Sequence, residues 1–137
     1  MRHRVFYVED NPDDVLLTQM ALQKAGLSIT LETAGDGGEA VAILEKKASG
    51  DLPDCILLDL KLPTSSGLEV LAWIREQPSL RRLPVIMLTS SLLPTDINRA
   101  YDLGANSYLI KPADLASLVE LARAIDLYWL QKNVRPC

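Results

Sequence analysis

Three acidic residues directly follow two apolar segments, where their side chains could act together. Glu9 and Asp10 come after the segment 5–8, and Asp59 comes after the segment 56–58. If these segments are neighbouring parallel strands, their carboxyl ends meet at one edge of the sheet and the three carboxylates converge. Carboxylates packed together repel one another, so at least one takes up a proton unless a cation neutralises them. Mg²⁺ suits such a site, because it prefers hard oxygen ligands and often bridges to a phosphoryl group.

A hydroxyl and an ammonium group are expected at the same edge. Thr89 follows the segment 84–88, and Lys111 follows the segment 107–110. Together with Asp59 they complete a set for phosphoryl transfer, because an aspartyl carboxylate can form an acyl phosphate. The Lys111 ammonium and Mg²⁺ would neutralise charge on the phosphoryl oxygens. The Thr89 hydroxyl would donate a hydrogen bond to the attached group.

Each of these residues also has an ordinary explanation. An acidic pair after a strand is usually a solvated loop or a helix cap, Thr89 alone is a strand-end residue, and Lys111 alone is a surface charge. Their coincidence at one expected sheet edge favours the functional interpretation.

The elements that must position these residues alternate along the chain. Strands are expected at 5–8, 28–33, 56–58, 84–88 and 107–110, and helices at 11–26, from 36 onwards, at 66–75, at 94–103 and from 113 to about 131. Asn11 is a good N-cap for the first helix, the acids 13–14 suit its positive end, and Gly26 suits its stop. The alternation indicates a doubly wound, flavodoxin-like α/β fold with a five-stranded parallel sheet of order 2-1-3-4-5. We expect one domain over residues 1–137, with its core at about 4–131, since no repeat or linker interrupts the pattern.

Composition narrows the classes of partner. The net charge is −4 and there is no Lys/Arg run, which excludes nucleic acid and anionic membranes as direct partners because both require a basic surface. No segment approaches the ~20 apolar residues of a membrane span. Cys55 lies in an apolar segment and Cys137 ends the chain, which indicates a reducing, cytoplasmic setting rather than a disulfide framework.

The motifs resemble the receiver domains of two-component response regulators, such as the bacterial chemotaxis regulator. The resemblance rests on Glu9-Asp10, Asp59 in DLKLPTSSG, Thr89 in LTSS, Lys111-Pro112, Pro63, Gly67 and the Gly104-Ala105 pair. The spacings of 30 residues from Asp59 to Thr89 and of 52 residues from Asp59 to Lys111 match as well. The opening VEDNPDDVLL resembles single-domain regulators that partner phytochrome-type histidine kinases.

The resemblance implies a role for each residue of the acidic site. Asp59 would be the phosphoacceptor, and a phosphohistidine on a sensor histidine kinase would supply the phosphoryl group. Asp10 and Asp59 would be side-chain ligands of Mg²⁺, Glu9 would act through a bound water, and the Lys61 backbone carbonyl would be the third protein ligand. The chain would be a phosphoacceptor switch with slow self-dephosphorylation, and not an enzyme with a separate substrate.

The resemblance also implies a switch next to this site. Lys111 would pair with the phosphoryl oxygens, and the Lys111–Pro112 peptide bond is expected to be cis. Thr89 would move toward the phosphoryl group, and the Tyr108 ring would turn inward to fill the vacated space.

Lys61 departs from the family pattern, which more often has a small, amide or thioether side chain two residues after the phosphoacceptor. A backbone carbonyl ligand survives this change. Our hypothesis is that the Lys61 cation disfavours the attacking water and slows dephosphorylation.

The output is expected to be binding, because no further module follows the last helix. One stripe of this helix should pack on the sheet: Leu115, Leu118, Val119, Ala122, Ile125 and Trp129. Leu121, Tyr128 and Leu130 lie beside the stripe, which hints at a homodimer face formed with the fourth helix and the fifth strand.

Two other functions remain open. A receiver-like scaffold that has lost phosphorylation is disfavoured, because the complete set of Asp59, Thr89 and Lys111 is present. A Mg²⁺-dependent phosphatase or phosphotransferase with an aspartyl nucleophile usually has a second acid where Lys61 stands, and it needs a substrate cap.

Overall fold

A parallel sheet of five strands forms the centre of the structure, in the order β2-β1-β3-β4-β5. The computed structural model describes residues 2–136. The strands are β1 (His3–Val8), β2 (Ile29–Ala34), β3 (Cys55–Leu58), β4 (Val85–Thr89) and β5 (Ser107–Ile110). This order and direction confirm the predicted doubly wound α/β fold.

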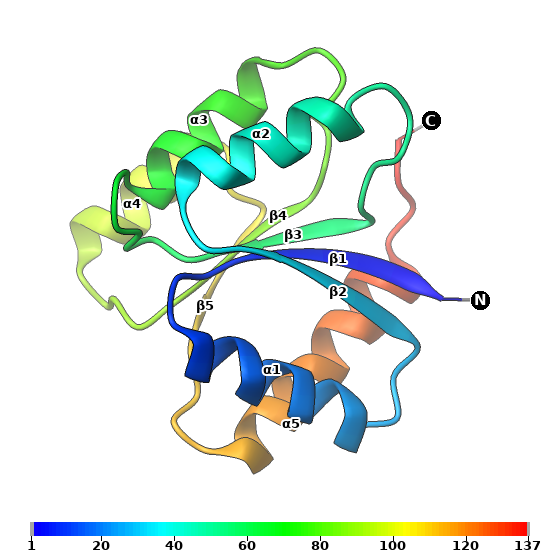
Figure 1. Cartoon of the computed structure of the whole chain (residues 1–137). Helices are drawn as coiled ribbons and strands as arrows, with labels where there is room; N and C mark the ends of the chain where they lie inside the picture. Colours follow the sequence, from blue (N-terminus) through cyan, green and yellow to red (C-terminus); the bar gives the residue numbers. More distant parts are fainter. Residues whose placement is uncertain (1, 137) are drawn as a thin grey trace.

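Helices cover both faces of the sheet. They are α1 (Pro12–Lys24), α2 (Gly37–Lys47), α3 (Gly67–Glu76), α4 (Pro94–Asp102) and α5 (Leu115–Ile125). In Figure 1, α1 and α5 lie on one face, and α2, α3 and α4 lie on the other. Successive strand residues point to opposite faces, so Phe6 and Ile56 enter one apolar cluster while Tyr7 and Leu57 enter the other. The two clusters hold the central strands rigidly, which fixes the position of whatever follows them.

N-cap side chains fix the residues at which α1 and α2 begin after the sheet edge. Asn11 Oδ1 accepts a hydrogen bond from Asp13 N at 2.9 Å, and Asp36 Oδ1 accepts one from Glu39 N at 2.8 Å. Both side chains satisfy amides that a helix start leaves unpaired. The first two predicted helix starts are therefore confirmed.

The last helical segment differs from the single helix predicted over 113 to about 131. α5 ends at Ile125 and continues as a π-helix, η1 (Asp126–Lys132). The Asp126 side chain is buried, and its carboxylate accepts a hydrogen bond from the Gln131 amide five residues later. This side-chain hydrogen bond spans most of the π-helical segment.

The apolar stripe predicted for this helix does pack inward. Leu118, Val119, Ala122 and Ile125 are buried, and Leu115 and Trp129 are partly buried against the same clusters. Leu121 and Leu130, predicted to lie beside the stripe, also pack against the core, whereas Tyr128 is exposed. No helix within residues 2–136 has the length and apolar character needed to cross a membrane.

Candidate functional site

Backbone hydrogen bonds continue past the strand ends and fix the residues that follow. Glu9 N donates to Ala34 O at 2.9 Å, and Asp59 N donates to Val8 O at 3.1 Å. Between the ends of β4 and β5, Lys111 N donates to Thr89 O at 2.9 Å. These bonds belong to the ladders of neighbouring strands, so the side chains emerge at one common edge, as the sequence predicted.

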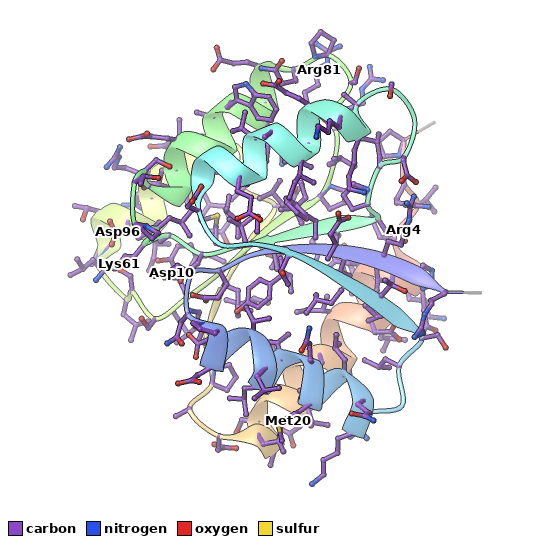
Figure 2. All side chains as sticks on the ribbon, viewed as in Figure 1. Arg4, Asp10, Met20, Lys61, Arg81 and Asp96 are labelled. Carbon is purple, nitrogen blue, oxygen red and sulfur yellow. The ribbon has the colours of Figure 1, made fainter. Side chains whose placement is uncertain are left out.

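The three predicted acidic residues converge at this edge. Glu9, Asp10 and Asp59 each offer a carboxylate oxygen, and these oxygens lie within 4.8 Å of one another. Glu9 and Asp59 are buried, whereas Asp10 is exposed. A set of hard oxygen donors this close fits Mg²⁺, with open positions left for water or a phosphoryl oxygen. Figure 2 shows Asp10 and Lys61 at this end of the sheet and Arg4 at the opposite end.

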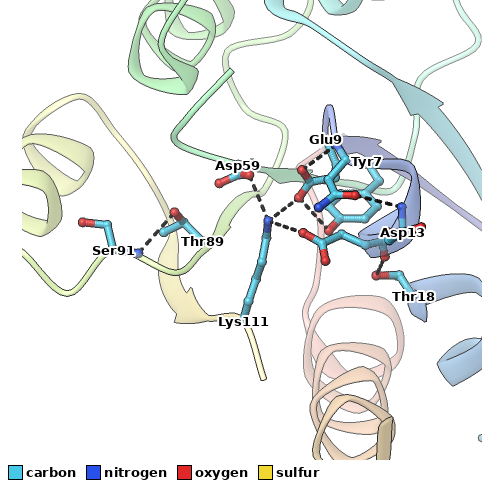
Figure 3. A network of polar contacts seen from close by, with 10 residues as sticks. Tyr7, Glu9, Asp13, Thr18, Asp59, Thr89, Ser91 and Lys111 are labelled. Carbon is cyan, nitrogen blue, oxygen red and sulfur yellow. Dashed lines mark hydrogen bonds and ion pairs between the residues drawn. The ribbon is translucent and has the colours of Figure 1, made fainter. Parts of the chain in front are cut away.

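Lys111 reaches across the sheet edge to three carboxylates (Figure 3). Its Nζ lies 2.9 Å from Asp59 Oδ2 and 3.0 Å from Asp14 Oδ2, and it forms an ion pair with Glu9 Oε1. An ammonium has three N–H donors, so each carboxylate can take one of them. The ammonium therefore neutralises part of the negative charge gathered around Asp59.

Glu9 is the most enclosed member of this network. Its side chain is only 1% exposed, and it accepts hydrogen bonds from Tyr7 Oη at 3.2 Å and from Asn11 N at 3.1 Å. Burial raises the pKa of Glu9, while the hydrogen bonds from Lys111 and the Asn11 amide act in the opposite direction. Burial likewise raises the pKa of the Tyr7 hydroxyl, so Tyr7 remains a donor to Glu9.

The environment of Lys111 stabilises its charged form. Burial by itself would lower the pKa of Lys111, but hydrogen bonds and ion pairs with Glu9, Asp59 and Asp14 outweigh burial and raise that pKa. The predicted cationic partner of Asp59 is therefore charged across the neutral pH range.

Asp14 is the member of this network that sequence reasoning missed. Its position at the start of α1 led us to interpret it only as a charge suited to the helix N-terminus. The contact joins residues 97 positions apart, and the available signal was that α1 begins just after Asp10, at the same edge of the sheet.

Thr89 is the last residue of β4, and Tyr108 lies within β5, where it is paired with Met87. Thr89 is buried, and its Oγ1 accepts a long hydrogen bond of 3.5 Å from Ser91 N. Tyr108 packs against the apolar cluster beneath α3, and its hydroxyl donates to Ser91 O at 2.9 Å. Ser91 Oγ donates to Asp96 Oδ2 of α4 at 2.6 Å. Both predicted switch residues thus contact one residue of the loop that leads into α4.

Lys61 lies in a loop that returns directly toward α3. Lys61 pairs with Ser66 in an isolated antiparallel bridge, and Gly67 N donates to Leu60 O at 2.7 Å. The Lys61 side chain is exposed. The loop places the Lys61 backbone two residues after Asp59, which is compatible with the predicted carbonyl ligand.

One expectation about this site is wrong. The Lys111–Pro112 peptide bond is trans, as are the other peptide bonds among residues 2–136. The trans form is lower in energy even before proline, by about 0.5–1 kcal/mol. Lys111 Nζ reaches Asp59 with this trans bond, so the ion pair does not need the expected cis form.

Comparisons with known proteins agree on one family. The sequence profile described as the response regulator receiver domain matches residues 5–123. The response regulator Rcp1 of Synechocystis sp. is 36% identical over 135 residues, covering 96% of this chain and 92% of that protein. The probable methanogenesis regulatory protein FilR2 of Methanothrix harundinacea is 38% identical over 134 residues, covering 96% of this chain and 86% of that protein.

Solved structures of response regulators also match this chain over nearly its whole length. The phosphorylated cyanobacterial phytochrome response regulator RcpA superposes with a TM-score of 0.90 at 39% identity, over 100% of both chains. The Mn²⁺-bound form of Rcp1 gives a TM-score of 0.85 at 35% identity, over 98% of this chain and 99% of that chain.

Proposed function

Because the chain belongs to the response regulator receiver domain family, we propose that it is a single-domain response regulator that accepts a phosphoryl group on Asp59. The observation that carries this proposal is the position of the Asp59 carboxylate. It lies 2.9 Å from the Lys111 ammonium and within 4.8 Å of the carboxylate oxygens of Glu9 and Asp10. This geometry supports Asp59 as the nucleophile, Lys111 as its cationic partner and Glu9 and Asp10 as further donors for a divalent cation.

In transfer from a phosphohistidine, an Asp59 carboxylate oxygen forms the new P–O bond and the P–N bond breaks. The imidazole leaves with the electron pair and is neutral because its ring carries, or takes from water, one proton. Lys111 lies where it neutralises charge on the phosphoryl oxygens during this exchange. Glu9, Asp10, Asp59 and the Lys61 carbonyl would hold Mg²⁺, which supplies further neutralisation of phosphoryl charge.

Phosphorylation would act on the surface through the β4–α4 loop. Thr89 would move toward the phosphoryl group and exchange its long hydrogen bond with Ser91 N for a shorter one. Because Tyr108 Oη binds Ser91 O and Ser91 Oγ binds Asp96, the shift of this loop would reach both β5 and α4. A phosphoryl group on Asp59 would in this way change the surface formed by α4 and β5.

The surface next to this loop supports a binding output. Four large apolar side chains on the loop, α4 and β5 are exposed by 39% or more: Leu92, Leu93, Tyr101 and Ile110. The predicted homodimer would bury these residues together with the exposed face of α5. A monomer by analytical ultracentrifugation in both phosphorylation states would contradict the dimer.

The donor is proposed to be a sensor histidine kinase of the phytochrome type. The resemblance to Rcp1 and to the phytochrome response regulator RcpA supports this partner. The predicted cytoplasmic location of this protein would suit such a kinase partner.

Incubation with Mg²⁺ and acetyl phosphate tests the proposed function. Intact mass should increase by one phosphoryl group, and both EDTA and the Asp59→Asn substitution should abolish the gain. An unchanged mass with Mg²⁺ binding confirmed by calorimetry would favour the scaffold alternative. Continuous turnover of a chromogenic phosphoester would favour the phosphatase alternative instead.

A further inference from the structure

Asp14 differs from the other carboxylates that contact Lys111. Lys111 Nζ contacts Glu9, Asp14 and Asp59. Within the described part of the chain, the cluster able to hold a metal ion contains Glu9 and Asp59, together with Asp10, but it does not contain Asp14. Asp14 is thus a partner of Lys111 that a cation in this cluster would leave in place.

This difference matters once a cation is bound. Mg²⁺ binds carboxylate oxygens, so a bound cation would share Glu9 and Asp59 with the Lys111 ammonium and weaken their hold on it. A lysine has a long flexible side chain and is a point charge rather than a rigid fork. Without another partner, its ammonium would sample positions away from the phosphoryl oxygens. Asp14 can hold one N–H of Lys111 while the others turn to the phosphoryl group.

The backbone of Asp14 is well placed for this role. Asp14 lies in the first turn of α1, where the Asn11 cap fixes the helix start. Asp14 O accepts a hydrogen bond from the buried Thr18 Oγ1 at 2.9 Å, within a helix that packs against α5. The Asp14 carboxylate therefore projects from a rigid element rather than from a loop.

We propose that Asp14 is a positioning residue: it holds Lys111 Nζ beside Asp59 when Mg²⁺ recruits the other carboxylates. This inference rests on the proposed phosphorylation of Asp59, and it adds a fixed anchor on α1 to that site.

The matched pair Asp14→Ala and Asp13→Ala tests the proposal. Both substitutions remove one acid from the first turn of α1, but Asp13 has no contact with Lys111 among the described side-chain contacts. With saturating Mg²⁺ and phosphoramidate as donor, Asp14→Ala should slow phosphorylation roughly threefold to fivefold, as expected for loss of a partly exposed ion pair. Asp13→Ala should keep the wild-type phosphorylation rate. Asp14→Glu, which retains the carboxylate, should recover most of the rate that Asp14→Ala loses.

A double-mutant cycle separates positioning from a purely structural effect. In a Lys111→Met background, Asp14→Ala should cause no further loss, because the group that Asp14 positions is gone. A full loss in that background, or a wild-type rate for Asp14→Ala alone, would overturn the proposal.

A second readout does not depend on phosphorylation. In protein labelled with ¹⁵N-lysine, the hydrogen-bonded Lys111 ammonium should give an Nζ–H signal that persists when Mg²⁺ is added to the wild type and to Asp13→Ala. In Mg²⁺-loaded Asp14→Ala the signal should be lost, and its persistence there would contradict the inference. If the wild type binds Mg²⁺ but is not phosphorylated, the proposed function fails while this signal still decides the role of Asp14.

Discussion

Lys111 Nζ lies 2.9 Å from Asp59 Oδ2, although the two residues are 52 positions apart in the chain. The contact forms because β3 and β5 both end at the same edge of one parallel sheet. Lys111 Nζ contacts Glu9 as well as Asp59, and both of these acids belong with Asp10 to the cluster that could hold a metal ion. The ammonium and a divalent cation would therefore compete for the same carboxylates before phosphorylation and act together during it.

Removing the ammonium should separate these two effects. In Lys111→Met, Glu9 and Asp59 lose their competing cation, so the protein should bind Mg²⁺ several-fold more tightly by calorimetry. Phosphorylation by a small donor should nevertheless slow at least tenfold, because charge on the phosphoryl oxygens is no longer neutralised. Weaker Mg²⁺ binding by Lys111→Met would show that the ammonium does not compete with the cation. Lys46→Met, on the exposed end of α2, provides the control.

Gly67 should not tolerate a side chain. An added Cβ would lie 2.0 Å from Asp59 O and 2.9 Å from Asp59 C, both of them backbone atoms. Gly67→Ala should therefore lower the free energy of unfolding by about 1–3 kcal/mol, the usual cost of overpacking, and should displace Asp59. Gly38→Ala, where the nearest atom lies at 3.4 Å, should be neutral or stabilising. Urea unfolding of both variants measures the difference, and equal midpoints would contradict this interpretation of the close approach.

Lys61 should lengthen the life of the phosphorylated state. Its exposed ammonium follows Asp59 by two residues, where it can pair with the phosphoryl group and hinder the attacking water. Lys61→Asn should therefore shorten the hydrolysis half-life, measured by the decay of the phosphorylated mass after the donor is removed. An unchanged half-life would refute this role for Lys61.

Asp114 should make α5 sensitive to acid. Hydrogen bonds from Ser117 N at 2.7 Å and from Ser117 Oγ at 3.0 Å hold the pKa of Asp114 below its usual value. Its contribution to stability is thus complete above the pKa of the unfolded chain, and it is lost as the pH falls through the lower pKa of the folded state. The difference in unfolding free energy between wild type and Asp114→Ala should be constant near neutral pH and should shrink below about pH 4. A difference that stays the same at acid pH would show that the ionised cap is not responsible.

Much of the fold could be predicted from local patterns. The alternation of short apolar segments with helical stretches indicated the five-stranded parallel sheet, and Asn11 marked the first helix start because its side chain satisfies an unpaired amide. The site residues Glu9, Asp59 and Lys111 could also be placed, since residues that follow parallel strands share an edge.

The remainder depends on contacts that no local pattern contains. The Asp14–Lys111 ion pair depends on how closely the start of α1 approaches β5. The change from α5 to a π-helix after Ile125 has no marker in residues 126–132, whose sequence resembles that of an ordinary helix. The trans Lys111–Pro112 bond was missed because the cis form was inferred from family resemblance rather than from these residues.

The central claim is that Asp59 itself carries the phosphoryl group. After incubation with Mg²⁺ and acetyl phosphate, borohydride reduction converts an aspartyl phosphate into homoserine, which peptide mass spectrometry can locate. We predict homoserine at position 59, dependent on both Mg²⁺ and donor, with Asp10 and Asp14 unchanged. Homoserine at another acid, or none at position 59 in protein that has gained one phosphoryl group, would contradict the account.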